Sequence, residues 1–521
     1  MSSPEEKALI FINQGKLNQA EVIYKELINL GSKNPFIYSN LAVIYGRKGE
    51  QKEKIKLLKK ALIINPNLCE VHNNLGNALQ DIEDHKTAIS SYKEAIKLNP
   101  NYVEAHYNLG IALHETGDLV GAISAFKKTI KINSNFFKAF NNLGTAFKDK
   151  GDINAAIDSF EEAIKLNPNF TEAHNNLGIA AHEKEDLQTA IVSFKEAIRL
   201  NSNFPDAHWN LSLAQLSIED YQNGLENYEW RLKKHDSIVH AHPRIIQWSN
   251  GLNELPEKLL VVSEQGLGDT IQFMRYIPYL QKQGIDVTFC AQKKLHSLIK
   301  SAGIHPNPIT PKQANQISEG FWIPLLSIPR YLKINPENPI IVNPYIYTTQ
   351  KSKQKWKNIL SKEQRPIIGI NWQGNPDVEK NLLKGRSLSL ENFSHIAKNN
   401  DYKLLSLQKG FGTEQLKSCS FKNQFVSCQK EINTIWDFEE IAAIILNCDL
   451  IISSDTSVAH LAGGMGKLTW LLLHKTPEWR WGLKKKNTFW YPSMRLFRQQ
   501  EKYNWNKVIK IVSDELRSNQ K

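Results

Sequence analysis

The sequence is short of cysteine and of long apolar runs, and both shortages narrow the classes of protein that it can encode. Its five cysteines, among 521 residues, lie at scattered spacings without a CxxC pair, which argues against a disulfide framework and a zinc site. No apolar run approaches the roughly 20 residues that cross a bilayer. The first residues carry two glutamates where an export signal carries positive charge. We therefore expect a cytoplasmic protein without a transmembrane segment.

The first part of the chain carries no excess of positive charge, whereas the second part does. Residues 1–240 hold 27 Lys and Arg against 30 Asp and Glu, whereas residues 241–521 hold 38 against 23. Such an excess of cations suits phosphate-bearing ligands, anionic lipid or nucleic acid. Because the chain lacks a recognisable nucleic-acid motif, we do not expect a nucleic acid partner, and peripheral contact with a membrane stays open.

A period of 34 residues runs through residues 1–235. The strings SNLA, NNLG, YNLG, NNLG, NNLG and WNLS recur at that spacing between residues 39 and 212. A second series of large side chains has the same period: Tyr24, Leu58, Tyr92, Phe126, Phe160, Phe194 and Tyr228. Three Asn-Pro pairs predict helix ends, since proline has no N–H and disfavours helix in the preceding residue. The pattern resembles the tetratricopeptide repeat, whose helical pairs stack into a superhelix, so we expect an α-solenoid here.

One asparagine recurs just before each leucine of these strings. The set is Asn40, Asn74, Asn108, Asn142, Asn176 and Asn210. An amide side chain can pair with both the N–H and the C=O of an extended peptide, so these residues are candidates for binding a protein or peptide. The array resembles the asparagine-lined repeats of protein O-GlcNAc transferases, which favours this interpretation. The alternative is that the asparagines hold neighbouring helices together.

The period stops after the repeats, and residues 236–256 are predicted to be a linker. Short apolar runs then alternate with amphipathic helical segments, which predicts parallel strands with crossover helices. The expected strands are 258–263, 286–291, 321–326, 367–372, 402–407, 450–454 and 468–473. A loop rich in Pro and Asn divides them into two groups. We expect two Rossmann-like α/β halves, residues 257–350 and 351–521, with a cleft between them.

Ligands of such sheets bind beyond the carboxyl ends of the strands, where helix N-termini present free N–H groups. The first strand end, EQGLGDT, contains Gly268 and Asp269 but fails the dinucleotide fingerprint, since Ile271 stands in place of the third glycine. Gly268 permits close approach of a ligand, and Asp269 is either a helix cap or a functional carboxylate.

Three further strand ends carry polar side chains suited to phosphate. NWQGNP and the basic stretch after it supply Gln373 and Arg386, and the loop after residue 407 supplies Gln408 and Lys409. The most informative is SSDTSVAHLAGGMGK, in which a buried strand leads into a helix start. It supplies Asp455, Thr456, Ser457 and His460.

Several long motifs of the second part resemble bacterial tetratricopeptide-repeat glycosyltransferases related to the lipopolysaccharide heptosyltransferases. The matching strings are GLGDTIQF, INWQGNP, SDTSVAHLAGGMGKLTWLLL, PEWRWG and WYPSMRLFRQ, in this order between residues 258 and 499. The resemblance implies a GT-B fold, a nucleotide-diphosphate-sugar donor as substrate, and no cofactor or required metal. It also implies a C-terminal helix, residues 505–517, that returns to the first half.

The resemblance also implies roles for individual residues. Asp269 corresponds to the catalytic base that takes a proton from the acceptor hydroxyl, with inversion at the sugar. Asp455, Thr456 and His460 correspond to residues at the donor diphosphate, with Ser457 beside them. Arg386 corresponds to a basic phosphate contact, and Glu414 to a ribose-binding acid.

Two other functions stay open. The chain could be a repeat scaffold whose α/β part is a degenerate or sensory nucleotide-sugar domain, or it could act on a cell-surface glycan or lipopolysaccharide. The tryptophans of the C-terminal part are also ambiguous, since core anchors and sugar platforms use the same side chain. They are Trp479, Trp481, Trp490 and Trp505, and we expect them in the core, while Arg480 and His474 beside them receive no role.

Overall fold

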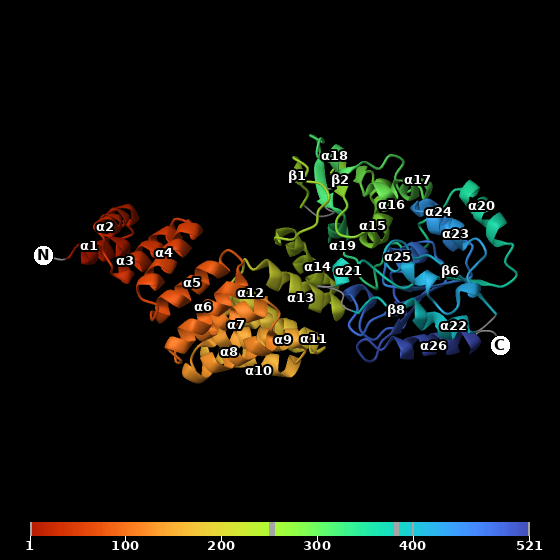
Figure 1. The fold of residues 1–521 in the computed structure, drawn as a ribbon. Helices are drawn as coiled ribbons and strands as arrows, with labels where there is room; N and C mark the ends of the chain where they lie inside the picture. The colour runs from red at the N-terminus through yellow and green to blue at the C-terminus, as the bar shows by residue number, and fades with distance from the viewer. Residues whose placement is uncertain (1–2, 250–255, 380–384, 399–400, 519–521) are drawn as a thin grey trace. The chain divides into compact units, whose positions relative to one another are not determined.

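The computed structural model describes residues 3–249, 256–379, 385–398 and 401–518, and Figure 1 shows its elements in chain order. The chain divides into two compact units, Met1–Phe204 and Pro205–Lys521. No helix within the described ranges combines the length and the apolar character that crossing a bilayer requires.

The first unit consists of helices arranged as consecutive antiparallel pairs, as the 34-residue period predicts. They are α1 (Pro4–Asn13), α2 (Leu17–Asn29), α3 (Pro35–Arg47), α4 (Gln51–Ile64), α5 (Cys69–Gln80), α6 (His85–Leu98), α7 (Val103–Glu115), α8 (Leu119–Ile132), α9 (Phe137–Lys150), α10 (Ile153–Leu166), α11 (Thr171–Glu183) and α12 (Leu187–Leu200). Aspartates begin several second helices: the side chains of Asp84, Asp118 and Asp152 each accept a hydrogen bond from the backbone N–H three residues later.

Each pair of helices is closely packed because a glycine of the first helix faces an aromatic ring of the second. A methyl group at Gly144 would lie 2.6 Å from the ring of Phe160, and one at Gly110 would lie 2.5 Å from that of Phe126. Both rings are fully buried. The recurring Leu-Gly of the sequence therefore permits a short distance between helices.

The second unit begins with a helical hairpin that the sequence assigns to the repeats. It comprises α13 (Pro205–Ser217), α14 (Tyr221–Tyr228) and the 3-10 helix η1 (Glu229–Lys233). The apolar side chains of this hairpin join the core of the following sheets, through Leu216, Tyr221, Leu225 and Tyr228. The compact units therefore divide at Phe204, whereas the predicted repeat domain extends to residue 235.

A parallel sheet with strand order β1-β4-β2-β3 follows. Its strands are β1 (Ile246–Gln247), β2 (Lys258–Val262), β3 (Asp286–Cys290) and β4 (Phe321–Pro324). The helices between them are α15 (Leu267–Phe273), α16 (Ile277–Lys282), α17 (His296–Ser301) and α18 (Pro311–Ala314). The strand β1, only two residues long, lies inside the predicted linker.

A second parallel sheet has the order β6-β5-β7-β8-β9. Its strands are β5 (Ile367–Asn371), β6 (Lys403–Ser406), β7 (Leu450–Ser454), β8 (Thr469–Leu473) and β9 (Met494–Arg498). The main helices are α20 (Gln350–Leu360), α24 (Phe438–Leu446), α25 (Ser457–Gly464) and α26 (Trp505–Ser518). All seven predicted strands are present, and the two parallel sheets are compatible with an α/β domain.

The C-terminal helix α26 differs from the expectation, which returned it to the first half. Its buried residues Val508, Ile509 and Val512 belong to the same apolar cluster as Ile368 and Leu472 of the second sheet. The apolar stripe of α26 thus packs on the second sheet, in the same half of the α/β region as α26 itself. It shields from water the apolar residues that β5, β7, β8 and β9 present on that face of the sheet. The predicted return to residues 257–350 is wrong.

Candidate active site

The carboxyl ends of β2 and β7 lie next to each other, since the helices that follow them, α15 and α25, are in contact. Gly268 makes the contact possible: a methyl group there would lie 2.9 Å from Cδ2 of His460 and 3.6 Å from Cα of Ser457. Two loops that are almost 190 positions apart in the sequence therefore form one site.

Asp269 uses its two carboxylate oxygens in different ways. Oδ2 accepts a hydrogen bond from the backbone N–H of Gly266 at 2.9 Å, which caps the start of α15. Oδ1 accepts from Nη2 of Arg480 at 2.6 Å. The side chain is 20% exposed, whereas that of Arg480 is 1% exposed. Asp269 is thus both a helix cap and one member of an ion pair at the site.

Asp455 and His460 form the buried part of the site. Trp481 donates its indole N–H to Oδ2 of Asp455 at 2.8 Å, and Oδ1 lies 3.9 Å from Nε2 of His460. Burial raises the pKa of Asp455 in spite of the opposing charges of Arg386 and Arg480. Burial and the same cations hold the pKa of His460 well below its usual range, so the imidazole is neutral at pH 7. Its Nδ1 lies 3.0 Å from the hydroxyl of Tyr491.

Thr456 connects β7 to its neighbour β5. Its hydroxyl donates to Oδ1 of Asn371 at 3.0 Å, so the side chain does not cap α25, which begins at Ser457. The first N–H groups of a helix have no acceptor within the helix. The start of α25 therefore offers donors and a positive dipole end to an anion.

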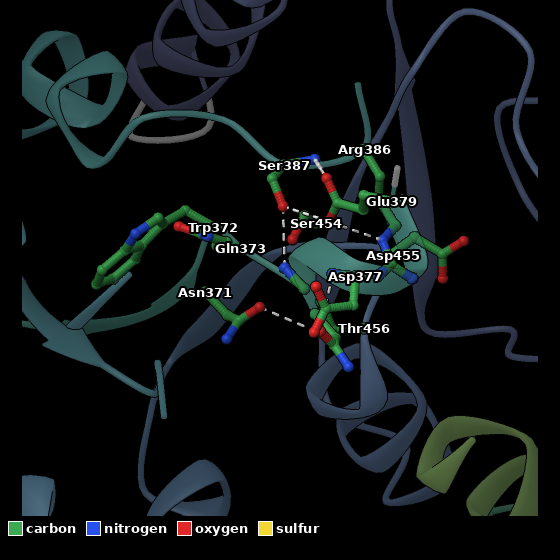
Figure 2. A network of polar contacts seen from close by, with 12 residues as sticks. Asn371, Trp372, Gln373, Asp377, Glu379, Arg386, Ser387, Ser454, Asp455 and Thr456 are labelled. Atoms are coloured by element: carbon green, nitrogen blue, oxygen red, sulfur yellow. Dashed lines mark hydrogen bonds and ion pairs between the residues drawn. The ribbon is translucent and has the colours of Figure 1, made fainter. Parts of the chain in front are cut away.

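Arg386 is held beside this helix start by a small polar network, which Figure 2 shows. Its Nε lies 3.4 Å from Oε1 of Glu379, and a methyl group at Gly374 would collide with its guanidinium. The hydroxyl of Ser387 accepts from the N–H of Gly374 at 3.0 Å, and its backbone N–H donates to Glu379 at 3.2 Å. This network positions a cation near Asp455.

Three of the predicted donor-binding residues have other partners. The carbonyl oxygen of the Gln408 side chain accepts from the N–H groups of Trp372 and Gln373 at 3.1 and 3.0 Å, and its amide donates to two backbone carbonyls. Lys409 donates to the carbonyl of Ile432, and burial lowers its pKa to about 8. The side chain of Gln373 accepts from that of Gln415 at 3.2 Å. In this structure these residues connect loops, and their contact with a donor stays a prediction.

Arg480 has no role predicted from the sequence, and the structure brings it to Asp269. The four tryptophans Trp479, Trp481, Trp490 and Trp505 are buried, as the core interpretation predicts. Trp481 has a second contact, since it donates to Asp455. Its place between two tryptophans marks Arg480 as a buried cation that needs a charged partner, but Glu478 two residues before it also supplies one, so the sequence does not point to Asp269.

Three of the repeated asparagines contact the preceding helical pair of the array. Asn108 donates to Oδ1 of Asn73 at 3.1 Å, and Asn176 donates to Oδ1 of Asn141 at 3.0 Å. Asn142 donates to the hydroxyl of Tyr107 at 3.0 Å. Each of these contacts joins residues 35 positions apart, which supports the interpretation that the asparagines hold neighbouring helices together.

No cluster of three or more His, Cys, Asp or Glu side chains within the described ranges is arranged to hold a metal ion. The prediction that the reaction needs no metal is not tested by this observation and stays a prediction.

Comparisons with known proteins match the repeats. A model described as "TPR repeat" matches residues 81–117, 144–184 and 180–219, and one described as "Tetratricopeptide repeat" matches residues 103–136. A comparison with curated proteins gave no match.

Three solved structures are similar to parts of this chain. MamA is 29% identical with a TM-score of 0.30, over 31% of this chain and 95% of MamA. YrrB, titled a TPR protein with an unusual peptide-binding site, is 20% identical with a TM-score of 0.32, over 35% of this chain and 95% of YrrB. A repeat protein from Cytophaga hutchinsonii is 18% identical with a TM-score of 0.38, over 44% of this chain and 94% of its own. From the family models, the chain contains tetratricopeptide repeats, which are typical of peptide and protein binding.

Proposed function

We propose that the second unit transfers a sugar from a nucleotide-diphosphate-sugar donor to an acceptor hydroxyl, and that its two sheets form a GT-B fold. The repeats would bind the protein or peptide that carries the acceptor. The observation that supports this most is the contact of α15 with α25, which brings Asp269 to the helix start that carries Thr456 and His460. A carboxylate and an anion-binding helix start are the two groups that an inverting transfer requires.

In the proposed reaction, Asp269 takes the proton of the acceptor hydroxyl as its oxygen bonds to the anomeric carbon of the sugar. The bond from that carbon to the diphosphate breaks, and the diphosphate leaves with the electron pair. The N-terminus of α25 and the guanidinium of Arg386 stabilise the negative charge that develops on it. Arg480 orients the carboxylate of Asp269 through the 2.6 Å contact.

The environment of His460 suits a site that holds a donor. Its neutral imidazole can exchange a hydrogen bond with a sugar or phosphate oxygen, and the Tyr491 hydroxyl fixes its ring. Asp455, with its raised pKa, is held by Trp481 at the base of the same loop. Ser457 would contribute its backbone N–H and hydroxyl to the diphosphate.

A thermal-shift panel tests donor binding directly. The wild-type chain is heated with UDP, ADP and GDP, and with UDP-glucose, UDP-GlcNAc, ADP-glucose and GDP-mannose, because a ligand of the folded state raises the Tm. We expect one nucleotide family to raise it and Arg386→Gln to reduce that shift. The matched control is Lys398→Gln, an exposed lysine of the same half. No shift with any member of the panel would favour the scaffold function instead.

A further inference from the structure

The helical hairpin α13–α14 with η1 contacts the loop that carries Asp269, although its sequence is that of a repeat. We propose that this hairpin positions the loop, residues 264–269, for catalysis, and that Arg231 and Tyr228 are its positioning residues. The inference rests on the proposed transferase function. It gives the last repeat pair a role in the active site itself, in addition to partner binding by the array.

Arg231 is the main contact between the hairpin and the loop. Its Nε and Nη2 donate to the two carboxylate oxygens of Glu264 at 2.9 and 2.8 Å, and both side chains are almost fully buried. Nη2 also donates to the hydroxyl of Ser327, and Oε1 of Glu264 accepts from the N–H of Leu326. A bidentate pair in a buried site fixes both partners in one geometry. The first residue of the loop is therefore fixed by the hairpin.

The positive charge of Arg231 is maintained in spite of burial. Burial disfavours the guanidinium of Arg231, but Glu264 and Glu229 keep its pKa above the usual value. A buried ion pair contributes little to net stability and is costly to break, so its value lies in the geometry that it imposes.

Gln265, the next residue of the loop, has the left-handed backbone conformation with a φ of 58°. A residue other than glycine keeps this conformation only where its surroundings hold it there. Two groups do so: the carbonyl of Ile238 accepts its N–H at 3.0 Å, and the hydroxyl of Tyr228 accepts from its side-chain amide at 3.3 Å. The strained residue directs the chain toward Gly266, whose N–H contacts Asp269.

The hairpin also reaches the partner of Asp269. The ring of Trp479 makes edge-on contacts with Tyr221 and Tyr228, at 6.2 and 6.1 Å between ring centres. The guanidinium of Arg480 lies 4.9 Å from the centre of the Trp479 ring. One hairpin thus supports both sides of the Asp269–Arg480 ion pair.

Two variants and one matched control test the proposal. Arg231→Lys keeps the charge but not the bidentate geometry, and Tyr228→Phe keeps the ring but removes the hydroxyl that Gln265 contacts. Glu226→Gln is the control, because it breaks a partly exposed ion pair of the same hairpin with Arg330 that does not involve the loop. All three are studied in the full chain by amide hydrogen exchange. Steady-state turnover of whichever donor of the panel binds is measured in parallel.

We expect faster exchange of amides in residues 264–269 for both variants and no change for the control. The kcat should fall about tenfold in Arg231→Lys and about threefold in Tyr228→Phe, with an unchanged KM for the donor, since small displacements of a catalytic group are costly. The KM for the donor should stay because the proposed phosphate contacts, Arg386 and the start of α25, lie outside the hairpin.

Other results would overturn the inference. Unchanged exchange in both variants, or faster exchange with an unchanged kcat, would show that the hairpin does not position the base, while the transferase function would stand. A lower kcat in Glu226→Gln of the same size would point to general loosening of the hairpin. If the wild-type chain turned over no donor, the proposed function would fail and the positioning role with it.

Discussion

The two units of this protein connect their polar side chains in opposite ways. In the helical unit the asparagine contacts join residues 35 positions apart, and the same kind of contact recurs from one pair of helices to the next. In the α/β unit the Asp269–Arg480 contact joins residues 211 positions apart, and it belongs to no series of contacts at a fixed spacing among the described residues. Repeated local contacts maintain a shape over many positions, whereas a single distant contact brings charged groups to one point. We therefore expect substitutions in the first unit to cost a little stability and those at the α/β site to change function or pH dependence.

The largest effect is expected at Asp269. In Asp269→Asn the side chain can no longer accept the acceptor proton, so kcat should fall at least about 100-fold while the donor-induced Tm shift stays. Turnover and thermal shift are measured on the same preparation. Asp286→Asn, at the exposed start of β3, is the matched control and should keep wild-type kcat. Near-wild-type turnover by Asp269→Asn would remove the base assignment.

The next largest effect is expected in the pH dependence of the free energy of unfolding, and it is due to His474. Burial, followed by the charge of Arg386, lowers the pKa of His474 to about 4. Its neutral form stabilises the folded state above the unfolded pKa near 6.5, and this stability is lost as the pH falls from there toward 4. Between pH 7 and pH 5 we expect a loss of about 2 kcal/mol in the free energy of unfolding. Denaturant titrations of wild type and His474→Gln at both pH values measure it.

The His474→Gln variant should lack this part of the pH dependence, and the exposed His235→Gln should keep it. An equal decline in wild type and His474→Gln would mean that other groups cause the acid sensitivity.

A smaller effect is expected where helices of the first unit are closest. Gly144→Ala places a methyl group 2.6 Å from the ring of Phe160, and this overpacking should outweigh the gain in helix propensity. We expect a net loss of about 1 to 2 kcal/mol, measured by denaturation of the repeat unit followed by circular dichroism. Gly46→Ala is the matched control, because its new methyl group meets only the flexible side chain of Lys54. This variant should be as stable as the wild type or more stable. Equal behaviour of the two variants would contradict the packing argument.

The smallest effect is expected for a single member of the asparagine series. Asn142→Ala removes one donor to the hydroxyl of Tyr107, which should cost about 1 kcal/mol or less. The same denaturation experiment measures it, with the exposed Asn154→Ala of α10 as control. A loss well above that range would mean that the members of the amide series stabilise the array cooperatively.

The sequence predicted the regular parts of both units well. The 34-residue period and the proline positions located the helical pairs, and the alternation of apolar runs located seven strands. These signals depend only on residues that are close in the sequence. They missed β9, whose sequence MRLFR carries two arginines among three apolar residues, and β1, which is too short to show a pattern. The location of α26 could not be predicted, since an apolar stripe indicates that a helix is covered but not by which half.

The candidate site was predictable in part. Asp269, Thr456 and His460 lie at strand ends, where ligands of such sheets bind, and the structure brings them together. Arg480 and Trp481 lie on a 3-10 helix far along the chain, and no local pattern links them to the first loop. Gln408 shows why a position at a strand end is not sufficient to predict a ligand contact. Its side chain forms hydrogen bonds with neighbouring backbone groups instead.

The position of the unit boundary at Phe204 has a consequence for how such proteins can change in length. Because α13 and α14 bury their apolar residues in the core of the sheets, shortening the chain before Pro205 leaves that core intact. Removal of all residues up to 235 would also remove Tyr221, Leu225 and Tyr228, and it would expose to water the apolar core residues that they cover. Gain or loss of whole repeats is thus tolerable upstream of the hairpin, and the hairpin itself is the fixed adaptor to which an array of any length can be joined.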